Sequence, residues 1–112
     1  MSKNSYLRQL RARWMLSQEE LASLLNITQG RVSRYEQGEE YPPLSISLAL
    51  QVVFGKQPRL CFAGLYGQLE DEVIARAAAL ERDIRGKADP GSVRKRHLLE
   101  SMIARAGNDQ QV

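Results

Sequence analysis

The amino-acid sequence predicts an all-α fold, and three observations support this prediction. Apolar residues recur at helical spacings of three and four along most of the chain. Residues that favour helix ends, namely Ser17, Asn26, Thr28 and Gly38, interrupt this pattern. Proline and glycine mark the later boundaries, because neither residue continues a helix readily.

The first helix is predicted over about residues 5 to 15, where Leu7, Leu10 and Trp14 lie at positions i, i+3 and i+7. All three side chains are expected to face the core. Trp14 is therefore interpreted as a packing residue and not as a functional aromatic residue. The same helix also carries three arginines: Arg8, Arg11 and Arg13.

Residues 17 to 38 predict two short helices joined by a tight turn. Ser17 and Glu20 form a capping box, so the first of these helices begins at Gln18. Asn26 ends it, because asparagine tolerates the left-handed conformation. The apolar positions of this helix share one face: Leu21, Ala22, Leu24 and Leu25.

The second of these helices is capped by Thr28 and ends before Gly38. A short helix, a turn of about three residues and another short helix make a helix-turn-helix pattern. Its inward positions are taken as Leu21, Leu25, Ile27, Val32 and Tyr35.

The charge distribution indicates which part of the chain faces an anion. Residues 1 to 38 contain six Lys or Arg and three acids, which accounts for the net charge of +3. Residues 39 to 66 hold two charges of each sign, and residues 67 to 112 hold eight of each. An excess confined to the helix-turn-helix segment is expected of a phosphate-facing surface.

Four ordered stretches resemble the Xre/Cro-like, lambda-repressor-like helix-turn-helix family. They are Leu-Arg-Gln-Leu-Arg at 7–11, Leu-Ser-Gln-Glu-Glu-Leu-Ala at 16–22, Val-Ser-Arg-Tyr-Glu-Gln-Gly at 32–38 and Pro-Leu at 43–44. The resemblance implies a five-helix bundle that binds double-stranded DNA as a two-fold dimer. Residues 29–37 would lie in the major groove, and residues 18–25 would cross the DNA backbone.

Four residues of the second motif helix are expected to read bases: Gln29, Gly30, Ser33 and Arg34. Glutamine pairs bidentately with adenine and arginine with guanine, whereas serine suits either base. Gly30 costs up to about 1 kcal/mol of helix propensity relative to alanine. Either the backbone must come close to DNA there, or the position is an exposed and neutral one.

Four residues are expected to contact phosphate: Gln18, Arg8, Arg13 and Arg31. Gln18 opens a helix, where unpaired amides and the positive helix end favour an anion. The resemblance places the same residue on a phosphate, a contact that fixes register without reading sequence. The resemblance also implies an internal ion pair between Arg11 and Glu36, because Glu36 would otherwise be a buried carboxylate without a partner.

The sequence departs from the family after Gly38, where a basic residue is common and Glu39 and Glu40 stand instead. Two acids beside a DNA backbone would repel phosphate. Either this loop points away from DNA, or the affinity is modest.

The rest of the chain predicts further helices. A stiff turn at 41–43 precedes a helix over 44–54, whose Leu48, Ala49, Val52 and Val53 are expected to close the core. A short helical turn within 56–64 carries Cys61 as a buried structural thiol. A long helix over 65–85 and a last helix over 92–106, capped by Ser92 and stopped by Gly107, complete the prediction.

Two domains follow from this pattern: a DNA-binding domain at 1–64 and a C-terminal helical extension at 65–112. The extension either packs on the bundle or builds the dimer interface, and the second interpretation is preferred because a single half-site binds weakly. A basic patch at Lys87 and Arg94–Arg96 is nearly cancelled by nearby acids, so it is interpreted as a solvated face.

Several function classes lack sequence support. The chain shows no signal core and no membrane-spanning run, and a single cysteine excludes an internal disulfide, so a cytoplasmic setting is expected. No catalytic, metal-binding or cofactor-binding pattern is present, and His97 has no neighbouring ligands in the sequence.

The sequence thus predicts a transcriptional regulator, acting as a repressor, that binds an inverted-repeat operator as a homodimer. The alternative is an antitoxin-like module whose C-terminal helices bind a partner protein while the helix-turn-helix autoregulates. An enzyme or a small-molecule sensor finds no support.

Overall fold

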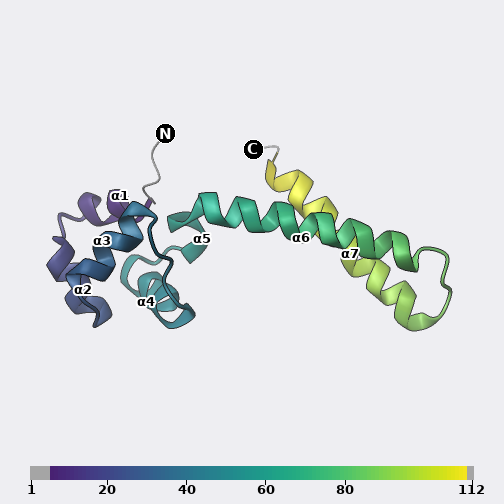
Figure 1. Cartoon of the computed structure of the whole chain (residues 1–112), viewed down its shortest axis with the longest axis horizontal. Coiled ribbons are helices and arrows are strands. Elements are labelled where there is room, and N and C mark those ends of the chain that lie inside the picture. Colours follow the sequence, from purple (N-terminus) through teal and green to yellow (C-terminus); the bar gives the residue numbers. More distant parts are fainter. Residues whose placement is uncertain (1–5, 111–112) are drawn as a thin grey trace. The chain divides into compact units, whose positions relative to one another are not determined.

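The computed structural model describes residues 6–110 and contains seven α-helices and no strand within that range (Figure 1). The helices are α1 (Tyr6–Arg13), α2 (Gln18–Leu25), α3 (Gln29–Gln37), α4 (Leu44–Phe54), α5 (Pro58–Cys61), α6 (Ala63–Ile84) and α7 (Pro90–Gln110). The all-α prediction is confirmed. Residue 5, the predicted start of the first helix, lies outside the described residues. Within the described range, no helix has the length and apolar character needed to cross a membrane.

The chain divides into two compact units, and the division falls inside α6, between Tyr66 and Gly67. We call them the N-terminal unit and the C-terminal unit. Each of the first five helices contributes at least one buried side chain to the core of the N-terminal unit. This core comprises Leu7, Leu10, Leu21, Ala22, Leu25, Val32, Tyr35, Leu50 and Cys61. Burial raises the pKa of the Cys61 thiol, as expected of a structural cysteine.

The ends of α2 and α3 have the caps that the sequence predicts. The Ser17 Oγ accepts from the Glu20 amide at 3.0 Å, while the Glu20 carboxylate accepts from the Ser17 amide at 2.8 Å. Thr28 caps α3 by accepting from the Arg31 amide at 3.2 Å. Asn26 and Gly38 follow the two helices with φ values of 57° and 75°. Local side-chain chemistry therefore fixes the boundaries of the helix-turn-helix.

The predicted packing role of Trp14 is wrong. Helix α1 ends at Arg13 and is followed by a tight turn. In this turn the Trp14 amide donates to the Arg11 carbonyl at 3.2 Å, and Met15 adopts a left-handed φ of 60°. This turn takes Trp14 out of the helical register that buries Leu7 and Leu10, and leaves its side chain 66% exposed.

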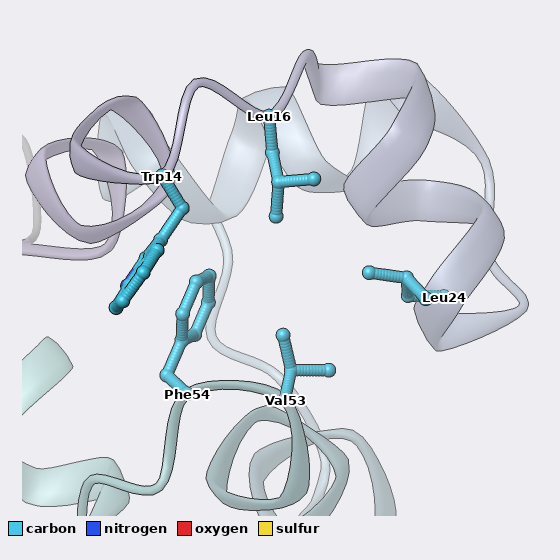
Figure 2. Close-up of a pocket in the computed structure, with 5 residues that line it drawn as sticks. All are labelled: Trp14, Leu16, Leu24, Val53 and Phe54. Atoms are coloured by element: carbon cyan, nitrogen blue, oxygen red, sulfur yellow. The ribbon is translucent and has the colours of Figure 1, made fainter.

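Trp14 instead lines an open apolar cavity of about 320 Å³ in the N-terminal unit (Figure 2). Figure 2 shows that the side chains of Leu16, Leu24, Val53 and Phe54 surround the same space. Leu24, which shares a face of α2 with the buried Leu21 and Leu25 in the sequence pattern, is 59% exposed at this cavity.

Helix α4 has the predicted bounds, but only two of the four residues expected to close the core, Ala49 and Val53, pack against it. Leu50 is buried, and Ile46, Ala49 and Val53 pack against the core, whereas Leu48 and Val52 are exposed. Eight of the eleven residues of this helix are apolar. Hydrophobic periodicity therefore cannot select its buried face, and the contacts with α2 and α5 decide it.

The C-terminal unit is built from α7 and the part of α6 that follows Tyr66. Its core is small and consists of Ala77, Ile84 and Leu99, with Met102 packed against them. The loop between the helices is shorter than predicted, because α7 begins at Pro90. Ser92 lies within the first turn of α7, so its predicted role as the cap is wrong. Gly107 lies inside α7 and does not end it, contrary to the prediction.

Asp89 is the residue that caps α7. Its carboxylate accepts from the Ser92 hydroxyl at 2.8 Å and from the Ser92 amide at 3.0 Å. These hydrogen bonds from Ser92 favour the charged form and lower the pKa of the Asp89 carboxyl.

Asp89→Ala is therefore expected to lower the melting temperature of the C-terminal unit at neutral pH. A carboxyl whose pKa is lowered by folding stabilises the fold above its ordinary pKa, and this contribution disappears as the pH falls through the lowered value. The difference in melting temperature between the variant and the wild type should thus become smaller below about pH 4. Thermal denaturation of both proteins at pH 7 and pH 3, followed by circular dichroism, measures this difference in melting temperature, and an equal difference at the two pH values would contradict the assignment. Asp89→Asn, which keeps an acceptor without the charge, is the control.

Candidate nucleic-acid interface

One face of α3 is exposed, and the other is fixed in the core. Val32, Tyr35 and Glu36 are buried. The exposed face carries the residues expected to read bases: Gln29, Gly30 and Arg34 are exposed, and Ser33 is half-buried. The helix therefore presents polar side chains outward from a rigid support.

Arg11 and Glu36 form an ion pair inside the N-terminal unit. The Arg11 Nε donates to the Glu36 Oε2 at 2.5 Å, and Nη2 donates to Oε1 at 3.1 Å. Only 3% of the Glu36 side chain and 15% of the Arg11 side chain are exposed. The hydrogen bond to Glu36 raises the pKa of Arg11 above its ordinary value. A third donation, from Arg11 Nη1 to the Leu16 carbonyl at 2.8 Å, also ties this arginine to the turn after α1.

A chain of hydrogen bonds leads from this ion pair to the exposed face of α3. The Gln18 Nε2 donates to Glu36 Oε1 at 3.0 Å, and the Gln29 Nε2 donates to Gln18 Oε1 at 2.8 Å. Since Gln18 donates to a buried carboxylate, its amide orientation is fixed and its oxygen must face Gln29. The Gln29 side chain is consequently held at the first turn of α3 before any ligand arrives.

The two exposed arginines of α3 share one acidic partner, Glu40. The Arg34 Nε donates to the Glu40 Oε2 at 3.2 Å, and the Arg31 Nη1 lies 3.7 Å from Oε1. Glu40 therefore lies beside the exposed face of α3, and of the two alternatives for this loop its position favours a modest affinity over a loop that points away from DNA. Glu39 is exposed and forms no ion pair among the described residues.

Gly30 lies close to the Arg34 guanidinium on α3. A Cβ atom at Gly30 would lie 3.5 Å from Arg34 Nη1, an ordinary contact distance. Space inside the domain therefore does not require glycine at this position. Ser33 accepts a hydrogen bond from Gln37 Nε2 at 3.2 Å, which adds Gln37 to the polar face.

The two α1 arginines that were expected to contact phosphate are exposed, but no described contact joins them to α3. Arg13 donates to the Tyr6 hydroxyl at 2.7 Å, and its guanidinium lies 6.0 Å from the Tyr6 ring centroid. Arg8 is exposed on α1.

Glu40 is the residue of this face that the sequence did not assign. Its charge is plain in the sequence, but its partners depend on how the chain turns after Gly38. The spacing of Arg31 and Arg34, three residues apart, places both on one side of α3 and was the available signal.

No group of three or more His, Cys, Asp or Glu side chains within residues 6–108 is arranged to hold a metal ion.

Residues 5–58 match the family described as a helix-turn-helix domain. No curated protein and no solved structure matches the chain.

Proposed function

We propose that the protein is a sequence-specific transcriptional repressor of the Xre/Cro-like kind, because residues 5–58 match the helix-turn-helix domain family. A DNA-binding regulator is the function that the domain supports. The proposal adds that α3 enters the major groove and that α2 crosses the backbone. The repressor acts by occupying its operator.

The observation that carries this proposal is the fixed geometry of Gln29 and Arg34. Gln29 is held by Gln18, and Arg34 is held by Glu40. Bidentate pairing of Gln with adenine and of Arg with guanine requires such a fixed direction, because both hydrogen bonds must form together. Ser33 and Gly30 complete the proposed base-reading set.

The proposed phosphate contacts are Gln18, Arg8, Arg13 and Arg31. Gln18 lies in the first turn of α2, where free backbone amides and the helix dipole favour an anion. The arginines add charge, which strengthens binding to any DNA sequence without reading it.

Selection of bound duplexes from a random DNA library tests the proposal. The expected result is an enriched inverted repeat whose half-sites lie about one helical turn apart, roughly 34 Å. Enrichment of no sequence, or binding that depends only on duplex length, would contradict it.

We further propose that the C-terminal unit joins two copies of the chain. Its own core is small, and an apolar stripe on α6 stays exposed at Leu69, Val73 and Leu80, each 45–47% accessible. A unit of this size has difficulty burying enough apolar surface alone. Pairing the stripes of two copies would cover them and would present two recognition helices to one operator.

Val73→Glu combined with Leu80→Glu is expected to convert a dimer into a monomer, because it places charge in the proposed apolar interface. Sedimentation equilibrium measures the change. Leu98→Glu is the control, since Leu98 is an exposed leucine of α7 and does not belong to the α6 stripe. A wild-type protein that is monomeric alone and co-purifies with a second protein would contradict the homodimer and favour the antitoxin-like alternative.

A further inference from the structure

The segment after α3 folds back along that helix. Gly38 adopts the left-handed conformation, and the Glu39 amide donates to the Arg34 carbonyl at 3.0 Å. The Tyr41 ring then meets the Phe62 ring edge-on, with 6.4 Å between centroids, which anchors the segment to the N-terminal unit. The position of Glu40 beside α3 thus follows from a fixed backbone turn.

Glu40 contributes little to the stability of the fold. Its side chain is 34% exposed, and its partners Arg31 and Arg34 are 51% and 45% exposed. Ion pairs at such exposed positions contribute little to folding. Folding stability therefore does not account for these ion pairs. Their effect on how Arg31 and Arg34 contact DNA does.

The hydrogen bond to Glu40 leaves the guanine-reading end of Arg34 free. Glu40 accepts from Nε, and no described hydrogen bond occupies Nη1 or Nη2. Nη1 lies over Gly30, at the exposed surface of α3. A bidentate contact to guanine needs two N–H groups in a fixed plane, and a guanidinium held at Nε presents its two terminal nitrogens in that way.

The negative charge of Glu40 weakens contacts between these two arginines and the phosphates of DNA. Non-specific binding depends on the positive charge that the protein offers to the DNA backbone. Glu40 offsets part of that charge at Arg31 and Arg34, and it adds repulsion toward any phosphate that approaches them. Binding that uses phosphate alone is weakened, while a guanine contact keeps its hydrogen bonds.

We propose that Glu40 is a specificity-determining residue of the DNA interface. It positions Arg34 for guanine and at the same time penalises binding to DNA that lacks a guanine there. This inference rests on the proposed function, because it requires α3 to read DNA. The proposed role accounts for an acidic residue at a position where a basic residue would raise the affinity for DNA.

The test compares Glu40→Gln with Glu39→Gln in the full chain. The two variants remove the same charge from adjacent residues, but only Glu40 is paired with Arg31 and Arg34. Three duplex probes are used: the sequence enriched by selection, a scrambled duplex of equal composition, and the enriched sequence with 7-deazaguanine at one guanine at a time. The modified base lacks the N7 acceptor that arginine uses.

The wild type is expected to lose at least about fivefold in affinity when the guanine read by Arg34 is replaced by 7-deazaguanine. Glu40→Gln should bind the scrambled duplex more tightly than the wild type does. It should also lower the ratio of specific to scrambled affinity by about fivefold or more and reduce the 7-deazaguanine effect. Glu39→Gln should keep the wild-type 7-deazaguanine effect.

An unchanged specificity ratio in Glu40→Gln, or an equal loss of guanine discrimination in both variants, would overturn the inference. Failure of the proposed function gives a different result. In that case the wild type itself does not distinguish any enriched duplex from its scrambled counterpart.

Discussion

Glu36→Ala is expected to lower the free energy of unfolding by about 3–5 kcal/mol, because it leaves the Arg11 guanidinium without its charged partner in a mostly buried site. Glu36 also accepts from Gln18, so the substitution removes three hydrogen bonds together. For a domain of this size the loss corresponds to a fall of at least roughly 12 °C in melting temperature.

Thermal denaturation followed by circular dichroism measures this effect. Glu39→Ala is the control, because it removes an exposed acid three residues away with little expected change. The double variant Arg11→Ala with Glu36→Ala should lose less than the sum of the two single variants, since neither charge is then left unpaired. An unchanged melting temperature in Glu36→Ala would show that the pair contributes nothing to the fold.

Gln29→Ala combined with Arg34→Ala is expected to abolish sequence discrimination. Each bidentate pair to a base contributes about 1–3 kcal/mol, so losing two corresponds to roughly 30-fold to 10⁴-fold in preference for the selected operator. Both side chains are exposed, so the melting temperature should change little. Footprinting on the selected operator measures the result.

The matched control for this variant is Gln68→Ala combined with Arg82→Ala, which removes the same residue types from exposed positions of the C-terminal unit. It should protect the operator as the wild type does. Continued protection of the same sequence by the Gln29 and Arg34 double variant would remove these residues from the base-reading role.

Local chemistry made the helix-turn-helix predictable. The capping box at Ser17, the left-handed Asn26 and Gly38, and the Thr28 cap each act on residues only a few positions away in the sequence. A reader of the sequence therefore needs no tertiary information to place α2 and α3. The exposed face of α3 followed in the same way, from periodicity within nine residues.

The features that escaped prediction depend on tertiary contacts. Every face of α4 offers apolar residues, so only its neighbours select Leu50 for burial. In the sequence, Trp14 lies at the spacing of the apolar stripe of α1, but the helix ends one residue before it. Glu40 gains its partners only because the chain folds back after Gly38.

The exposed indole beside the apolar cavity has a spectroscopic consequence. Trp14 is the only tryptophan in the chain, and 66% of its surface is in contact with water. Its emission in the native state should already lie near the wavelength typical of solvated indole, so unfolding will shift it little. Anything that covers the cavity will instead move the emission to shorter wavelength, which makes the single tryptophan a reporter of that surface.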